Sequence, residues 1–168
     1  TESSGVIPGI ALSRDGNRVA LMTGEHLLKF HQVNNQDPNI GIFVPGNVYP
    51  LKAAFGASSD ELIYAGDSIT PMAVDALTGA VRAVYRGHNG AVTAIDSHPT
   101  MDQIATGCWD TVVRIWKRST GDLERTIAGH TGPVTFCQYR NDGKVLITAD
   151  SNGNVRLSDP ATGASIAQ

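Results

Sequence analysis

The heptapeptide Gly87-His88-Asn89-Gly90-Ala91-Val92-Thr93 recurs 42 residues later as Gly129-His130-Thr131-Gly132-Pro133-Val134-Thr135. Beyond each copy the agreement continues, since Ile104-Ala105-Thr106-Gly107 aligns with Leu146-Ile147-Thr148-Ala149. Polar, turn-like segments repeat with a similar period along the whole chain. They are centred on Arg14, Ser58, Pro99 and Asn141, at spacings of 44, 41 and 42 residues. A period of about 20 to 50 residues is the signature of a repeat architecture.

Each repeat consists of short runs of Val, Ile, Leu, Thr and aromatic residues, separated by clusters of Asp, Asn, Ser and Gly. This alternation is typical of short strands joined by hairpin turns. No window keeps an apolar period of about 3.6 residues over three turns, as an amphipathic helix would. The sequence therefore predicts an all-β array of four antiparallel units, each with four strands, over about residues 5–46, 47–86, 87–128 and 129–168.

Composition narrows the class of protein. The 168 residues include 13 Lys and Arg against 16 Asp and Glu, for a formal net charge of −3. That balance argues against the broad basic field of a nucleic-acid or anionic-membrane binder. No apolar run reaches the length of a membrane span, and the two cysteines lack metal-ligand spacing. We expect an intracellular protein, cytoplasmic or nuclear, with no membrane insertion, no metal and no cofactor.

The repeated residues resemble the WD40 repeat, which has a Gly-His pair near one end and Trp-Asp near the other. The third unit matches almost completely, although Lys117 stands where the family has its final Asp. The fourth unit has Ser158 in place of the Trp, and the second keeps only Val74-Asp75 at that place. The resemblance implies β-propeller blades. Since such blades form rings of seven or eight, it also implies further blades from the same parent chain or from a second chain.

The resemblance implies a structural tetrad of His88, Thr106, Asp110 and Trp116 in the third unit. Their side chains can saturate one another with hydrogen bonds when they are buried together. The fourth unit keeps His130 and Thr148 but has Asn152 where the Asp would be. We therefore expect a partial tetrad of His130, Thr148 and Asn152, and a softer fourth blade.

Three patterns point to other chemistry and are interpreted as structural. His, Asp and a hydroxyl could form a nucleophilic triad, but the repeat register accounts for all three. Gly66-Asp67-Ser68 resembles the nucleophile block of some esterases, yet no Asp-x-x-His follows it. A basic group in the third unit is interpreted as a solvated sheet edge rather than an anion site. It comprises Arg114, Lys117, Arg118 and Arg125.

The family resemblance also implies a partner-binding face. Three positions in each blade recur on it: the residue before the turn Asp, and the two residues that flank the first valine of the inner strand. In this sequence they are Trp109, Ala91, Thr93, Ser151, Pro133 and Thr135. Trp109 is the exceptional member, because a large exposed aromatic is a preferred interface anchor.

The leading interpretation is a non-catalytic scaffold that binds proteins or peptides within a multiprotein assembly. One alternative is a component of a ribonucleoprotein or chromatin complex that contacts nucleic acid, which the acidic balance disfavours. Another is a sensor propeller of a signalling protein.

Overall fold

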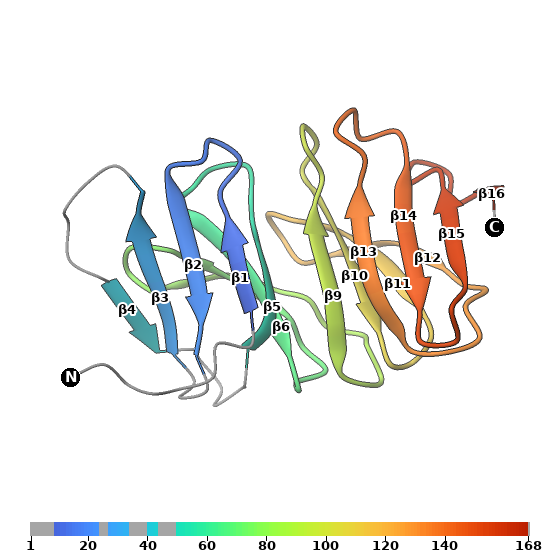
Figure 1. Cartoon of the computed structure of the whole chain (residues 1–168), viewed down its shortest axis with the longest axis horizontal. Helices are drawn as coiled ribbons and strands as arrows, with labels where there is room; N and C mark the ends of the chain where they lie inside the picture. The colour runs from blue at the N-terminus through green and yellow to red at the C-terminus, as the bar shows by residue number, and fades with distance from the viewer. Residues whose placement is uncertain (1–8, 24–26, 34–39, 44–49, 168) are drawn as a thin grey trace.

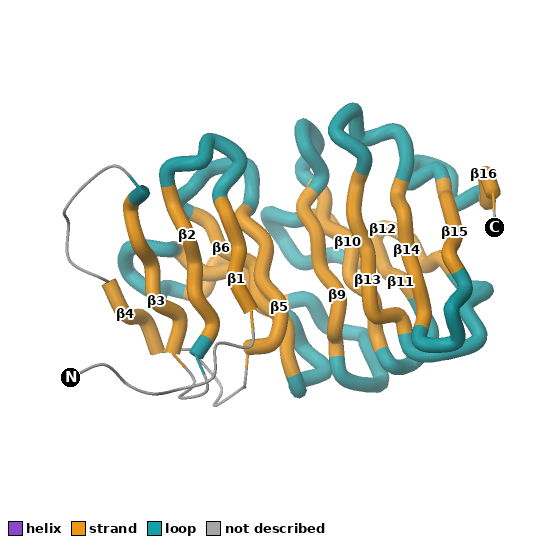
Figure 2. The backbone as a smooth tube through the Cα atoms, viewed as in Figure 1, coloured by secondary structure: helices purple, strands orange, loops and turns teal. Residues whose placement is uncertain are grey.

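The computed structural model describes residues 9–23, 27–33, 40–43 and 50–167. Within these residues the chain forms four antiparallel sheets of four strands each (Figure 1). Strands and turns account for the regular structure of the described part (Figure 2), as the periodicity predicts. In the same residues, no helix has the length and apolar character needed to cross a membrane. The expected chain segment Pro45-Gly46-Asn47, which enters the second unit, lies outside the described residues.

Every sheet is a simple meander in which consecutive strands pair. The first contains β1 (Gly9–Leu12), β2 (Arg18–Met22), β3 (Leu27–Gln32) and β4 (Ile40–Phe43). The second contains β5 (Pro50–Phe55), β6 (Glu61–Gly66), β7 (Met72–Asp75) and β8 (Val81–Val84). The third contains β9 (Val92–Ser97), β10 (Gln103–Cys108), β11 (Val113–Lys117) and β12 (Leu123–Ile127). The fourth contains β13 (Val134–Tyr139), β14 (Leu146–Asp150), β15 (Val155–Ser158) and β16 (Ser165–Ala167). We call these sheets blades 1 to 4.

The Thr-Gly pairs of the sequence form the turn before the outermost strand. Gly79, Gly121 and Gly163 all have positive φ, between 73° and 84°, a conformation that glycine adopts without steric cost. Each donates its N–H to the carbonyl four residues earlier. In blades 2 and 4 that earlier residue is an Asp, Asp75 or Asp159, whose carboxylate also accepts N–H groups of the turn. Lys117 cannot accept them, so the turn of blade 3 lacks this cap.

The hydrophobic core lies between blades rather than within one. The first strands β1, β5, β9 and β13 contact one another in succession. Blades 1 and 2 share a cluster that includes Phe30 and Phe55, which meet edge to face. Blades 2 and 3 share one around Tyr85 and Trp116. The blade 3–4 cluster combines Ala94, Ala105, Val113, Ile115 and Ile127 with Val134, Cys137, Tyr139 and Leu146.

The two blades at the ends of the row expose apolar side chains on their outward sides. Ile10 and Leu12 are exposed on β1, and Phe136 and Val155 are exposed on blade 4. In blade 3 the residues aligned with Phe136 and Val155 are Ala94 and Val113, and both are buried against blade 4. The outward side of blade 4 is therefore apolar, like the side of blade 3 that packs against blade 4.

Gly107 lies at a close approach of blades 3 and 4, because a Cβ there would lie 2.5 Å from Val134 Cγ1 and 3.1 Å from Ala94 Cβ. We predict that Gly107→Ala lowers the free energy of unfolding by about 1–3 kcal/mol, as overpacking does. Urea denaturation measures it. Val134→Ala should relieve the clash, so the double variant should be more stable than the sum of the two single effects predicts.

Gly153→Ala is the control, since a Cβ there meets nothing within 4 Å and only its positive φ is strained. Val134→Ala should not rescue this control. Strict additivity of Gly107→Ala and Val134→Ala would contradict the packing argument.

Candidate functional site

The four residues of the proposed tetrad come from separate elements of blade 3 and meet in its interior. His88 lies in the segment between β8 and β9, Thr106 on β10, Asp110 in the turn after β10, and Trp116 on β11. Thr106 and Trp116 are fully buried, and His88 is nearly so. Antiparallel pairing of β10 with β11 brings Thr106 and Trp116 together.

The Thr106 hydroxyl is the centre of the network. It lies 2.6 Å from His88 Nε2 and 2.8 Å from Trp116 Nε1, which donates its N–H. It also lies 3.5 Å from the carbonyl oxygen of Arg114, to which it donates its own proton. A hydroxyl can accept two hydrogen bonds and donate one, so these three contacts use its full capacity.

Arg114 is a further member of the network, and it sets the protonation of His88. Arg114 Nη1 lies 2.6 Å from His88 Nδ1 and 2.7 Å from Asp110 Oδ2. A guanidinium only donates, so His88 Nδ1 must accept, and the ring proton is on Nε2, facing Thr106. Burial, followed by the positive charge of Arg114, lowers the pKa of His88 to about 4. His88 is therefore neutral at pH 7.

Asp110 closes the network toward the surface. Burial alone would raise the pKa of its carboxyl, but the hydrogen bonds from the Asn89 N–H and from Arg114 outweigh this and lower it to about 2. The Asn89 N–H lies 3.0 Å from Oδ2, and the Val112 N–H lies 3.1 Å from Oδ1. One carboxylate thus fastens the segment before β9 to the turn after β10.

In blade 4 the acid of the network is Asp150, and the prediction that Asn152 occupies that place is wrong. His130 Nδ1 lies 3.0 Å from Asp150 Oδ2, and His130 Nε2 lies 2.8 Å from the Thr148 hydroxyl. Because a carboxylate only accepts, Nδ1 carries a ring proton, and in the neutral ring Nε2 then accepts from Thr148. His130 and His88 are therefore opposite tautomers.

The acid of the network lies two residues earlier in blade 4, at the end of β14, than in blade 3, where it lies in the turn after β10. Asp150 pairs with Val134 as Cys108 pairs with Val92, so Asp150 occupies the place of Cys108. Asp150 Oδ2 nevertheless accepts the Thr131 N–H at 3.1 Å, as Asp110 accepts that of Asn89.

Asn152 and Asn154 make local hydrogen bonds around this acid. Asn152 donates its amide to the Thr131 hydroxyl at 3.1 Å. Asp150 also accepts from Asn154. Burial would raise the pKa of the Asp150 carboxyl, but the hydrogen bonds from Asn154, His130 and the Thr131 N–H outweigh this and hold it below its usual value. The expectation of a softer blade 4 therefore loses one of its two reasons. The other reason stands, because Ser158 offers no indole N–H.

A metal site is disfavoured by the charges around the candidate ligands. His88, Cys108 and Asp110 place ligand atoms within 4.8 Å of one another. However, Arg114 contacts both the imidazole and the carboxylate, so a cation there would meet a fixed positive charge. Burial also raises the pKa of Cys108 to about 11, and its thiol donates to the Gly90 carbonyl. A neutral thiol is a poor ligand.

The other catalytic candidates also have structural contacts. Ser68 lies in the turn after β6, where its hydroxyl accepts the Thr70 N–H at 3.1 Å. The interpretation of the basic group as a solvated edge is wrong for Arg114, which is buried. It is wrong also for Arg118, which pairs with Glu61 of blade 2 and with Asp102.

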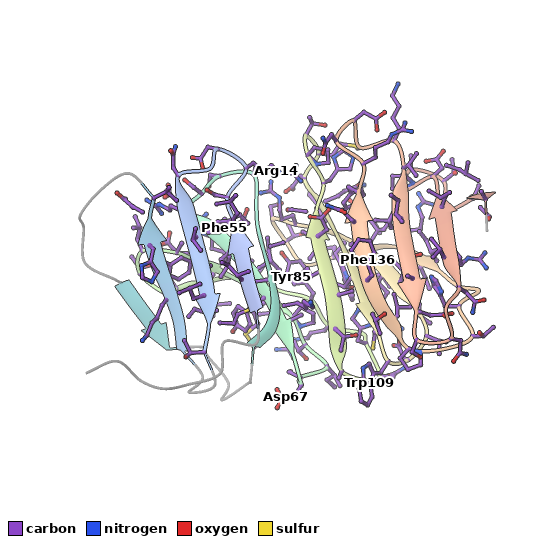
Figure 3. The ribbon with its side chains drawn as sticks, in the orientation of Figure 1. Arg14, Phe55, Asp67, Tyr85, Trp109 and Phe136 are labelled. Carbon is purple, nitrogen blue, oxygen red and sulfur yellow. The ribbon has the colours of Figure 1, made fainter. Side chains whose placement is uncertain are left out.

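The expected partner-binding positions lie at the same end of blades 3 and 4 as the turns after β10 and β14. Trp109 is 60% exposed, although its backbone N–H donates to the Ala91 carbonyl at 2.9 Å. Thr135 and Ser151 are exposed, whereas Ala91, Thr93 and Pro133 are half-buried. Thr93 donates its hydroxyl to the Val134 carbonyl, which ties blade 3 to blade 4. Trp109 is therefore the large side chain that this group presents to solvent (Figure 3).

We predict that His88 makes the protein sensitive to mild acid. Its pKa is about 4 in the fold and about 6.5 when unfolded, so the unfolded chain binds the extra proton between these values. The free energy of unfolding should fall by up to about 3 kcal/mol from this residue as the pH drops from 7 to 4. His88→Gln should lower stability at pH 7 but give a shallower dependence on pH. His31→Gln is the matched control, and equal slopes for wild type and His88→Gln would refute the assignment.

The two imidazoles should differ in a long-range proton–nitrogen correlation spectrum of the rings. We predict that His88 shows the pattern of an Nε2–H tautomer and His130 that of an Nδ1–H tautomer. Arg114→Leu removes the donor to Nδ1, so His88 should then change toward the pattern of His130. The same tautomer for both residues in the unmodified chain would contradict the proposed direction of these hydrogen bonds.

Comparisons with known proteins agree with this geometry. The family model described as "WD domain, G-beta repeat" matches residues 79–117 and 121–159. The "Nuclear distribution protein nudF" of Aspergillus niger is 30% identical over 103 residues, which cover 56% of this chain and 23% of that protein. The "Nuclear distribution protein PAC1-1" of Uncinocarpus reesii is 37% identical over 76 residues, 44% of this chain and 17% of that protein. The chain thus spans about a fifth of the length of these relatives.

A chain in the solved "Crystal Structure of Mitotic Checkpoint Complex" has a similar fold. It superposes with a TM-score of 0.85, covering 99% of this chain and 51% of that one, at 19% sequence identity. At this identity the likeness concerns the fold alone. The two matched segments are WD40 repeats in the second half of the chain, and the four four-stranded blades have the β-propeller fold of the solved structure.

Proposed function

We propose that this chain is a non-catalytic platform for protein interaction, with Trp109 as its anchor. The observation that carries the proposal is the contrast within one turn. Asp110 is fastened inside the blade, while the adjacent indole is 60% exposed. A rigid backbone that holds a large aromatic in solvent has little conformational entropy to lose on binding. Indoles are also enriched among the residues that dominate interface energies.

The contacts within the polar clusters support a non-catalytic role. In blade 3 the imidazole, hydroxyl, carboxylate and guanidinium are hydrogen-bonded to one another and to the backbone. A catalytic group needs a lone pair or hydrogen-bond donor that is free to engage the substrate, and a base needs access to the proton that it removes. The names of the fungal relatives refer to nuclear distribution and to no reaction. We place the protein inside the cell on the same basis.

The outward sides of the end blades support a second part of the proposal, in which further blades of the same type cover them. Blade 3 meets blade 4 through Ala94 and Val113, and blade 4 repeats these positions with Phe136 and Val155. The blades would come from the same parent chain or from a second one, completing a ring of seven or eight. Nucleic acid is a poorer fit to this surface, since the net charge is −3 and the platform positions carry no Lys or Arg.

The proposal is tested with a photo-crosslinking residue, benzoylphenylalanine, placed at position 109. We predict that it captures a protein partner, and that the purified partner binds Trp109→Ala at least about 10-fold more weakly than wild type. The stability of Trp109→Ala should change by less than about 0.5 kcal/mol, because the side chain is exposed.

Position 123 provides the matched control, because Leu123 is exposed on the outer strand β12, away from the platform. The crosslinker at 123 should not capture the same protein. Equal capture at both positions, or undiminished binding by Trp109→Ala, would reject the platform. Binding that weakens steeply with salt and requires RNA or DNA would favour the nucleic-acid alternative.

A further inference from the structure

Arg156 on β15 is the counterpart in blade 4 of Arg114 in blade 3. Arg156 pairs with Thr148 on β14, as Arg114 pairs with Thr106 on β10. In blade 3 the guanidinium is buried and donates to the carboxylate of Asp110, four residues earlier in the chain. The two arginines thus occupy equivalent places in neighbouring sheets, and their surroundings can be compared directly.

The acid that would pair with Arg156 is missing from the equivalent place in blade 4. The residue four positions earlier is Asn152, which is neutral. Asp150 is close in the chain, but its carboxylate accepts from His130, from Asn154 and from backbone N–H groups of its own turn. Among the described residues, other arginines form ion pairs with carboxylates and Arg156 does not.

Most of the donors of the Arg156 guanidinium are unused. Its Nη1 donates to the Gly129 carbonyl at 3.0 Å. Its Nε is buried and has no hydrogen-bond partner in the part of the chain that the structure describes. A guanidinium carries five N–H donors and a fixed positive charge, and burial of such a group is costly unless it is paired. A counter-charge at this place would therefore be stabilising.

A second donor faces the same space. Arg156 and Thr131 line one pocket of about 310 Å³, and the other described residues that line it are neutral. The Thr131 hydroxyl accepts from the side-chain amides of Asn152, at 3.1 Å, and Asn154, at 3.0 Å. Because a hydroxyl accepts two hydrogen bonds and donates one, its own proton is left to donate. The pocket thus offers a guanidinium and an O–H donor to one ligand.

A further blade beside blade 4 would not supply the missing acid. Arg114 makes its side-chain contacts inside blade 3, although blade 4 lies next to it. Val113, the preceding residue, packs against blade 4, and successive residues of a strand point to opposite faces. By the same register Val155 faces outward and Arg156 faces the side of blade 3. The counter-charge would therefore come from a ligand that enters the pocket.

We propose that this pocket binds the carboxylate of an acidic side chain, Asp or Glu, of a protein partner. The planar guanidinium of Arg156 matches the two oxygens of a carboxylate, and the Thr131 hydroxyl adds a third donor. The pocket carries one positive charge, which a carboxylate balances, whereas a phosphate dianion would exceed it. The inference rests on the proposed platform function, since Ser151 of the platform lies in the turn beside the pocket, and it adds the chemistry of the partner.

The test uses labelled pools of capped heptapeptides with random flanks and a fixed central residue, titrated against the whole chain at low salt by fluorescence anisotropy. The central residue is glutamate, glutamine or phosphoserine. We expect the glutamate pool to bind about 3- to 10-fold more tightly than the glutamine pool, and more tightly than the phosphoserine pool. Arg156→Gln should remove this preference, and Arg156→Lys should keep part of it, because it retains the charge without the planar fork.

Equal binding of the glutamate and glutamine pools, or no detectable binding of the glutamate pool, would overturn the inference. Tightest binding of the phosphoserine pool would overturn the assignment to a carboxylate. An undiminished preference in Arg156→Gln would place the acidic ligand elsewhere on the chain and would also reject the proposed pocket.

Arg125→Gln is the matched control. Arg125 Nη1 also donates to a carbonyl, that of Thr162, and its Nε is also buried without a partner in the described structure. Its contact is with the turn before β16, at the other end of β15 from the pocket. Arg125→Gln should therefore keep the glutamate preference, and a loss equal to that of Arg156→Gln would count against the pocket.

Asn152→Asp tests the pocket with Arg156 in place. The introduced carboxylate stands four residues before the arginine, as Asp110 stands before Arg114. It should lower the glutamate preference, because it pairs with the guanidinium and repels a second carboxylate. A preference that is unchanged in Asn152→Asp would reject the pocket even if Arg156→Gln failed to fold.

The two levels of the proposal fail in different ways. A partner that crosslinks at position 109 and binds Arg156→Gln as tightly as wild type leaves the platform intact and rejects the acidic ligand. A chain that captures nothing at position 109 but keeps the glutamate preference retains the carboxylate site and rejects the platform.

Discussion

The hydroxyl of Thr106 is the group on which the order of blade 3 depends. It accepts hydrogen bonds from His88 and Trp116 and donates one to the backbone carbonyl of Arg114, so three separate elements meet at one atom. Losing any partner would leave the others buried and unsatisfied, at a cost of about 1–3 kcal/mol for each group. Through Arg114, which donates to both His88 and Asp110, the constraint reaches the segment before β9 and the turn after β10. The surface position of Trp109 follows from this chain of contacts.

Adjacent residues of that turn therefore serve opposite requirements. Asp110 is drawn inward by Arg114 and by backbone N–H groups, while Trp109 is left in solvent with only its main chain bound. A flexible turn would let the indole fold back onto apolar surface and hide. The buried polar network opposes this, so in the proposed platform it would support recognition without touching a ligand. His88 has a structural role in this network, and burial together with the adjacent guanidinium of Arg114 favours its neutral form.

The repeat period and the hairpin rhythm were sufficient to predict sixteen strands in four meanders, because hydrophobic alternation and turn residues are local signals. The network was less predictable where it depends on direction. Alignment of the repeats assigns the acid of blade 4 to the turn, at Asn152, but Asp150 at the strand end two residues earlier reaches the imidazole instead. The charge pattern predicts that Arg114 is a cation at the sheet edge, because the sequence alone does not show that its side chain turns into the blade. The exposure of Trp109 could be predicted from its place in a turn and from the family resemblance, but the contacts that hold its turn are tertiary.

The matched repeats are out of phase with the sheets. The segment 79–117 begins with β8, the outer strand of blade 2, and ends after β11, the third strand of blade 3. Each sheet is therefore completed by residues of the next repeat. A nascent blade cannot close until the following unit has begun to leave the ribosome, so folding is coupled to the direction of synthesis. Duplication of one unit in a gene would likewise lengthen the row by a whole blade, since the new copy supplies the last strand of one sheet and receives its own from its successor.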